Sequence, residues 1–131
     1  MGTNPVVNVS PTNLIQLVSF RSDDNSGLLN VDFSQNSLLE TVFIHGPFPG
    51  TPPPITTIDL SQNLNLVSFT GDFLDNVNTI IFPVTSTLTN IDVRYLSDPT
   101  FDLSLLSGLE DLRIGGWRGN VNITLPNVYT S

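Results

Sequence analysis

Residues 31–39 read VDFSQNSLL and residues 58–66 read IDLSQNLNL, two nearly identical stretches that lie 27 positions apart. A catalytic motif is seldom duplicated in this way, whereas self-similarity at a regular spacing is the sequence signature of repeat architectures. The pair therefore indicates that internal repetition decides the fold.

The same spacing of apolar residues extends along the whole chain of 131 residues. Each copy holds two apolar residues two positions apart, such as Ile58 and Leu60, as in a strand with one buried face. A polar turn of the type Ser-x-Asn follows, and then a second apolar set. The pattern predicts a single solenoid domain over 1–131 that is mainly β, with little or no α-helix. Its copies begin near residues 7, 31, 58, 80 and 101, with a partial sixth near 121.

The composition agrees with strands and turns rather than helices. The chain has no Ala and is rich in Asn, Thr, Ser, Pro, Val and Ile, which is a poor mixture for helices and a suitable one for strands. The extra length of the copy that begins near 31 lies in residues 46–54, GPFPGTPPP. Because its prolines and glycines exclude a regular helix or a central strand, we expect a loop that bulges from one coil.

Residues 28–38, LLNVDFSQNSL, fit the signature L-x-x-L-x-L-x-x-N-x-L, and residues 55–63, ITTIDLSQN, fit most of it. The chain therefore resembles the leucine-rich repeat proteins, and its two-part rhythm is similar to the short-period repeats of bacterial surface proteins. The resemblance implies a right-handed β-solenoid of about five coils. It carries almost no information about activity, because one fold hosts many functions.

The resemblance also implies that the repeated Asn turns inward and hydrogen-bonds backbone amides at the bend, which satisfies groups otherwise buried without partners. Asn36 and Asn63 are expected to form this ladder. Thr12 and Thr85 are expected to replace Asn in part and Leu106 not at all, so the stack should be least regular near the last copy. Two apolar columns are expected along the stack: Val31, Ile58, Ile80 and Phe101, and Leu39, Leu66, Leu88 and Leu109.

The net charge and the absence of cysteine limit the kinds of partner and cofactor that we expect. The net charge of −8 disfavours nucleic acid and anionic membrane surfaces. No apolar run approaches the roughly 20 residues needed to span a bilayer, so we expect no membrane insertion, and no signal peptide is visible. The chain has no Cys and hence neither disulfides nor a thiolate zinc site. We expect no metal and no cofactor.

The outward positions of the first strand of each copy form the candidate binding face. Neighbouring coils lie roughly 4.8 Å apart, so Asp32 and Asp59 are expected to stand side by side. Such a face suits a basic protein surface, a glycan or calcium, and its alternative is a solvated face with incidental Asp. The residues of this face are Asn30, Asp32, Thr57, Asp59, Thr79, Ile81, Thr100 and Asp102.

The second strand of each copy offers another face, of mixed charge. Phe43 is expected to be an exposed anchor there, and Arg94 is expected to pair with Asp72 or Asp92 across coils. His45 is the only His, and no Ser-His-Asp arrangement is marked around it. Trp117 is a candidate sugar platform or a cover for the C-terminal end. The residues of this secondary face are Phe43, His45, Asp92, Arg94, Arg113 and Trp117.

Three functions are compatible with this sequence. The first is a non-enzymatic protein-binding or adhesion module, because solenoids offer broad faces. The second is a structural or decoration component of a virion or other large assembly, since bare solenoid ends invite association. The third, least favoured, binds or cleaves polysaccharide. The favoured partner is a protein, a second copy of the chain included, with a glycan as an alternative. The expected location is extracellular, on a cell surface or on a virion.

Overall fold

The computed structural model describes residues 7–9, 14–24, 26–85, 87–97, 99–116 and 119–126. Within these ranges all regular secondary structure is β-strand and no helix occurs. The strands are β1 (Val7–Val9), β2 (Ser19–Asp23), β3 (Leu28–Val31), β4 (Thr41–His45), β5 (Thr57–Asp59), β6 (Ser68–Leu74), β7 (Thr79–Ile81), β8 (Asn90–Leu96), β9 (Thr100–Asp102), β10 (Asp111–Gly115) and β11 (Asn122–Thr124).

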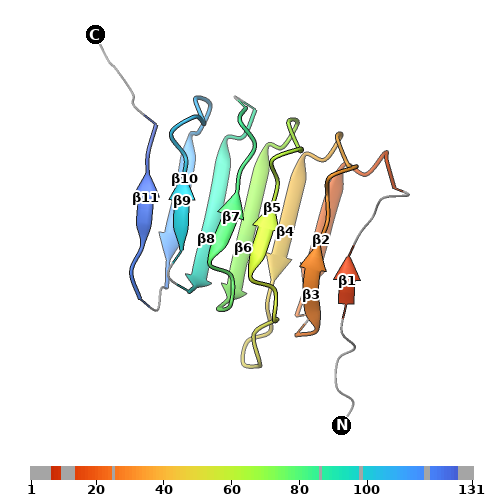
Figure 1. Cartoon of the computed structure of the whole chain (residues 1–131), viewed down its shortest axis with the longest axis vertical. Helices are drawn as coiled ribbons and strands as arrows, with labels where there is room; N and C mark the ends of the chain where they lie inside the picture. The colour runs from red at the N-terminus through yellow and green to blue at the C-terminus, as the bar shows by residue number, and fades with distance from the viewer. Residues whose placement is uncertain are drawn as a thin grey trace.

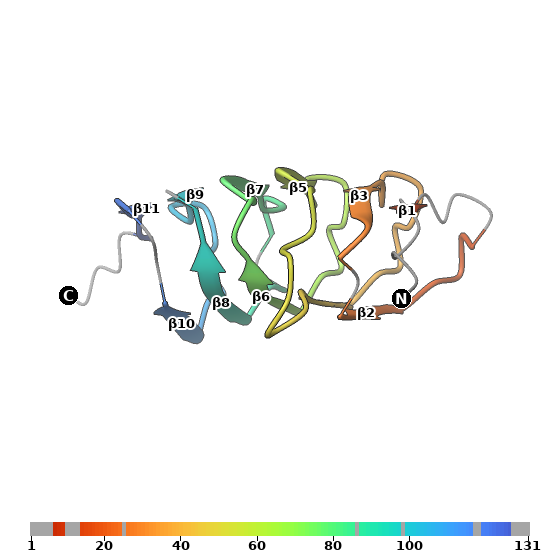
Figure 2. The same cartoon turned by 90° about the horizontal axis from the view of Figure 1, so that it is seen from below.

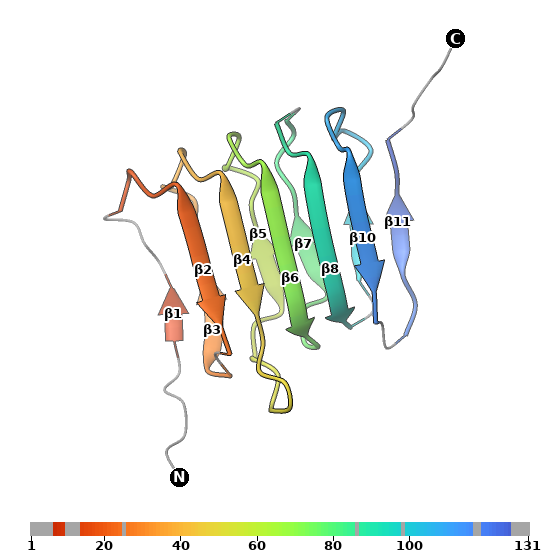
Figure 3. The same ribbon diagram turned by 180° about the vertical axis from the view of Figure 1, so that it is seen from behind.

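The strands form two layers, and each coil contributes one strand to each layer (Figures 1 and 3). The back layer is one parallel sheet in the order β10-β8-β6-β4-β2. The front layer consists of a two-stranded sheet, β1-β3, and a four-stranded sheet, β11-β9-β7-β5. The chain rises through the front layer, crosses over and descends through the back layer as it advances, which makes a right-handed β-solenoid of about five coils (Figure 1). The prediction of this fold class is confirmed.

The strand register gives the true offset between coils. Val42 pairs with Phe69, and Ile58 pairs with Ile80, so the offsets of 27 and 22 residues hold. The first offset differs from the expected 24, because Val9 pairs with Val31 and Phe20 with Val42, which is 22. A slip of two residues keeps every side chain on the same face of a strand, so alternation alone does not distinguish the two registers.

The two layers face each other (Figure 2), and buried apolar side chains from both form one core. The column of Val31, Ile58, Ile80 and Phe101 is buried throughout. In the second column, Leu39, Leu66 and Leu88 are fully buried and Leu109 is only partly buried. Gly71 interrupts the apolar pattern because the ring of Phe69 occupies its space: a Cβ at Gly71 would lie 3.1 Å from that ring.

The two asparagines lie inside the bend, as expected. Asn36 Nδ2 donates to the carbonyl oxygen of Leu14 at 2.8 Å. Asn63 Nδ2 donates to the carbonyl oxygens of Phe33 at 3.0 Å and Asn36 at 2.9 Å. Both side-chain amides thus donate to carbonyl groups of the preceding coil. Each asparagine therefore ties its own turn to the turn before it.

In the later coils other groups take the place of the asparagine side chains. Thr85 and Thr87 both donate their hydroxyls to the Leu64 carbonyl, at 3.0 Å. Leu106 is buried and its N–H still closes the turn onto Leu103 O at 3.0 Å, whereas Thr12 lies outside the described residues. The expectation that the stack is least regular near the last copy is wrong. β9 pairs with β11 and β10 with β8 along their lengths, whereas the front layer divides between β3 and β5. Between β7 and β9, Thr79↔Thr100 is the one described pair.

The segment 46–54 contains no strand and joins β4 to β5, as expected for a loop. Figure 3 shows it extending below the end of β4. Asn76 Nδ2 on the following coil donates to the Pro53 carbonyl at 2.9 Å, and the N–H of Gly46 donates to the Asp72 carbonyl at 2.8 Å. Two hydrogen bonds thus hold the loop against its neighbour.

Candidate functional site

The aspartates of the front layer have a local structural task. Asp32 Oδ1 accepts the N–H of Ser34 at 2.9 Å, and Asp59 Oδ1 accepts the N–H of Ser61 at 2.9 Å. Asp102 Oδ1 accepts the N–H of Ser104 at 3.0 Å. These are Asx-type turns, in which a side-chain oxygen caps the backbone two residues on. We call these three residues the turn-capping aspartates.

The same hydrogen bonds favour the ionised form of two of these carboxyls. The hydroxyl and the N–H of Ser34 lower the pKa of Asp32 below its ordinary value. The hydroxyl and the N–H of Ser104 lower the pKa of Asp102 in the same way. A hydrogen bond to the charged form of an acid stabilises that form, so both residues carry their negative charge at neutral pH while they cap their turns.

The aspartate row is interrupted at Ile81. In that coil the residue two positions later is Pro83, which has no N–H to donate. An aspartate at 81 would therefore have no turn to cap. Ile81 is instead 42% exposed and its register partner in β5 is Asp59. The exchange of aspartate for isoleucine in this coil thus goes with the loss of the backbone N–H that an aspartate would cap.

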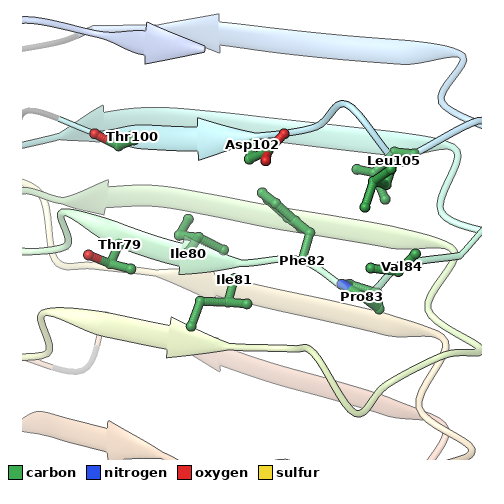
Figure 4. A pocket seen from close by; sticks show the side chains of 10 residues that line it. Thr79, Ile80, Ile81, Phe82, Pro83, Val84, Thr100, Asp102 and Leu105 are labelled. Carbon is green, nitrogen blue, oxygen red and sulfur yellow. The ribbon is translucent and has the colours of Figure 1, made fainter. Parts of the chain in front are cut away.

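An apolar hollow of about 330 Å³ opens beside this coil, between β7 and β9 (Figure 4). Figure 4 shows Val84 and Leu105 facing it from the turns of neighbouring coils. Val84 is 67% exposed and Leu105 is 63% exposed. Thr79, Thr100 and Asp102 lie at its border. We call this cavity the front hollow.

Sequence reasoning missed Val84 and Leu105, although a signal was present. In the register of the coils they occupy the position of Gln35 and Gln62 in the two preceding copies. A polar turn position has therefore become apolar twice in succession, next to the exchange at Ile81. Only the stacking of coils brings these three apolar side chains to one place.

Of the predicted neighbours, Asp32 directly follows β3 and Asp59 ends β5, and these two strands do not pair. The front layer divides between β3 and β5, so the expected ladder spacing does not apply here. Both aspartates nevertheless line one shallow hollow of about 240 Å³, together with Asn30 and Gln62. The three threonines of the predicted face do form a row, since Thr79 is the register partner of both Thr57 and Thr100.

The predicted secondary face is largely committed to internal contacts. The guanidinium of Arg21 lies 4.0 Å from the centre of the Phe43 ring. Phe43 is half-buried, so the expectation that it is exposed is wrong, while its use as an anchor stays a prediction. Arg94 binds Asp92 with two hydrogen bonds of 2.9 Å. Both lie on β8, so this pair forms along the strand and not across coils. A strand separation of two residues places both side chains on one face. Arg113 pairs with Asp111 on β10 in the same manner, at 3.2 Å.

His45 lies among aromatic and acidic groups. Its Nδ1 is 3.4 Å from Asp24 Oδ1, and its ring packs against Phe43 and, edge to face, against Phe73. Trp117 lies outside the described residues. Among the residues that the structure describes, no group of three or more His, Cys, Asp or Glu could hold a metal ion.

No family model, no curated protein and no solved structure matches the chain. Within the described ranges, no helix has the length and apolar character that crossing a bilayer requires.

Proposed function

We propose that the chain is a non-enzymatic protein-binding module whose front layer docks a partner protein over the front hollow. The observation that carries the proposal is the local change from polar to apolar residues at Ile81, Val84 and Leu105. Elsewhere the repeat holds polar residues at these positions. An exposed apolar patch with a polar rim is typical of a protein-interaction surface.

The energetics support this use of the surface. Full burial of an exposed apolar side chain is worth roughly 1.5–3 kcal/mol, and each of these partly exposed side chains would contribute a part of that on binding. None of the three belongs to the buried core, since all three are exposed large apolar side chains. Thr79, Thr100 and Asp102 supply hydrogen-bonding groups around the front hollow. Core and rim of this kind match the anatomy of protein interfaces.

The role of the aspartates favours binding over catalysis. A polysaccharide-cleaving site of the β-helix kind would use a pair of free carboxyl groups, whereas the three carboxylates of the front layer cap turns. As part of the same proposal, the coils are leucine-rich repeats of the short-period kind. This is supported by the burial of the signature residues Leu28, Phe33 and Asn36. The proposed location is extracellular, on a cell surface or on a virion.

A second candidate is a structural component of a larger assembly held by protein contacts. It is favoured by a separate observation: Leu14, Ile15 and Val18 in the first coil are all exposed. Such residues next to the edge strand β2 invite association with another chain. In this case the partner would be a second copy or a neighbouring subunit.

The test compares two double variants of matched chemistry. Val84→Ser/Leu105→Ser alters the front hollow, and Leu29→Ser/Leu38→Ser removes two exposed apolar side chains from another coil. Each protein is immobilised and chemically cross-linked to an extract of the organism that produces it. We expect a protein that wild type and the control retain and the hollow variant loses. Equal retention by all three would contradict the proposal.

Light scattering over a range of concentrations separates the two candidates. A mass that stays at one chain, together with a foreign protein in the cross-linked sample, supports the binding module. A mass that rises with concentration, and falls back for Leu14→Ser/Ile15→Ser, supports the structural component.

A further inference from the structure

Three aromatic rings form a stack across successive coils at the end where β6 and β8 finish. Phe48 and Phe73 are stacked with centres 4.5 Å apart, and Phe73 and Tyr95 with centres 4.4 Å apart. Phe48 belongs to the loop 46–54 and the other two to β6 and β8. Neither the predicted binding face nor the front hollow contains any of them.

The backbone under two of these rings is strained. Phe73 has a φ of 52° and Tyr95 a φ of 54°, in the left-handed region that bulky side chains rarely adopt. The equivalent residues of the first and fifth coils are Asp24 and Gly116, which tolerate this conformation better. The equivalent residue of the second coil, Gly46, is not left-handed. The position therefore requires neither the left-handed backbone nor an aromatic residue, yet two successive coils combine the two.

Folding alone does not account for the stack. Ring stacking offsets part of the backbone strain, but Phe48 remains 70% exposed to water. Strained residues that persist beside an exposed surface are a reason to look for a function. Here the two residues with left-handed backbone place their rings in a stack with Phe48 of the loop.

An open groove of about 340 Å³ runs along these rings, and we call it the aromatic groove. Its walls are partly preset, because Gly46 fits tightly against the next coil: a Cβ there would lie 2.0 Å from the Phe73 carbonyl oxygen. The groove offers two polar groups, a carboxylate and a phenol hydroxyl. Its lining includes Pro47, Phe48, Pro49, Phe73, Asp75 and Tyr95.

We infer that the aromatic groove binds a proline-rich segment of a partner protein that also carries arginine. Rings and prolines are the surfaces on which a polyproline II segment packs, and its preformed shape limits the entropy lost on binding. Such a segment leaves its carbonyls without partners, and the Tyr95 hydroxyl can donate to one. The Asp75 carboxylate at the groove can attract a guanidinium.

Charge complementarity supports the arginine. The chain carries a net charge of −8, which attracts a basic segment. The molecule also contains the same combination once within itself. The guanidinium of Arg21 lies 4.0 Å from the centre of the Phe43 ring and binds the Asp23 carboxylate at 2.6 Å. The lining of the aromatic groove also combines rings with a carboxylate.

This site is separate from the front hollow, since the two share no lining residue. The inference therefore goes beyond the proposed function and does not depend on it. Either surface can fail its test while the other passes.

The experiment uses fluorescence anisotropy with the full chain and a labelled synthetic peptide of about ten residues, which has prolines in PxxP spacing and one arginine at each end. Two further peptides replace arginine by glutamate or all prolines by alanine. The variants are Phe48→Ala and Asp75→Asn. Glu110→Gln removes one charge elsewhere, and Val84→Ser/Leu105→Ser alters the other surface.

We expect saturable binding of the first peptide, weaker by about tenfold for Phe48→Ala and by about fivefold for Asp75→Asn. The two control proteins should bind as wild type does. Both altered peptides should bind more weakly than the first. Phe48 stacks on Phe73 but is 70% exposed, so its removal should lower the melting temperature only slightly. Tyr95→Asn offers a second ring deletion that tolerates the left-handed backbone.

Three results would overturn the inference. The first is no saturable binding of the arginine peptide by wild type. The second is equal binding of the glutamate or alanine peptide, which would indicate a non-specific surface. The third is a loss of affinity in Glu110→Gln as large as in Asp75→Asn, which would reduce the effect to net charge.

Discussion

Ile81 lies two residues before Pro83. In three other coils the position of Ile81 holds a turn-capping aspartate, and the position of Pro83 holds the serine that donates its N–H to that aspartate. The two exchanges belong together, because proline has no N–H and an aspartate before it would cap nothing. The loss of the cap and the weak pairing of β7 with β9 occur in the same coil. The front hollow opens at that coil.

The first prediction concerns the contribution of a turn-capping aspartate to stability. Asp59→Ala removes the acceptor for the Ser61 N–H and should lower the free energy of unfolding by about 1 kcal/mol. Asp59→Asn retains an acceptor oxygen and should lose less. Urea denaturation followed by circular dichroism measures both.

The reciprocal change tests whether proline is the cause. Ile81→Asp alone should not stabilise the protein, since Pro83 has no N–H to be capped. Ile81→Asp combined with Pro83→Ser should be more stable than the sum of the two single changes predicts. Simple additivity in this double-mutant cycle would show that the exchanges at 81 and 83 are unrelated.

Much of the fold was predictable because a solenoid repeats its apolar spacing. The register between Ile58 and Ile80 follows from that spacing. The register of the first coil did not follow, because a shift of two residues leaves the buried face unchanged and Val7 and Val9 fit either choice. The length of the first coil could therefore be determined only from the backbone structure, whereas the fold class could be predicted from the sequence.

The site was less predictable than the fold. Outward orientation of Asp32 and Asp102 suggested a binding face, but orientation does not reveal that each carboxylate accepts an N–H two residues later. The aromatic groove was not foreseen at all. Phe48, Phe73 and Tyr95 are far apart in sequence, and their contact depends on left-handed backbone that bulky residues do not signal.

The second prediction is a dependence of stability on acid. The pKa values of Asp32 and Asp102 are lower in the folded chain than their ordinary value of 3.8. Their contribution to stability is thus present above that ordinary value and is lost as the pH falls through the lower folded-state pKa. The melting temperature should fall as the pH drops below about 4.

The variant Asp32→Asn/Asp102→Asn isolates these two groups. Its melting temperature should change less steeply with pH in that range than that of wild type. A parallel decline in both proteins would assign the acid sensitivity to other carboxyls. Thermal melts at several pH values below neutrality provide the comparison.

The third prediction concerns the asparagine ladder. Asn63 is fully buried and its amide serves the carbonyls of Phe33 and Asn36. Asn63→Ala leaves both carbonyls without this donor and opens a cavity, so it should cost about 2–4 kcal/mol of unfolding free energy. Asn63→Leu should restore volume but not the donor, and should recover only part of the loss.

Asn65 is the matched control. Its amide also donates to a carbonyl of the preceding coil, that of Ser37 at 2.8 Å, but at the exposed surface. Asn65→Ala should therefore change the unfolding free energy by less than about 1 kcal/mol. Equal losses at the two positions would mean that burial adds nothing to the ladder.

The last prediction compares two glycines, one in the loop after β4 and one at the end of the edge strand β10, with very different space around them. A Cβ at Gly46 would lie 2.0 Å from the Phe73 carbonyl oxygen, whereas a Cβ at Gly115 would meet nothing within 4 Å. Gly46→Ala must push two coils apart and should destabilise the protein by more than about 2 kcal/mol. Gly115→Ala should be neutral or stabilising by about 0.4–1 kcal/mol, because alanine restricts the unfolded chain. Differential scanning calorimetry of both variants decides the matter: similar melting temperatures would show that the loop 46–54 is not held tightly by Gly46. Since that loop carries Phe48, Gly46→Ala should also weaken peptide binding in the aromatic groove, while Gly115→Ala should not.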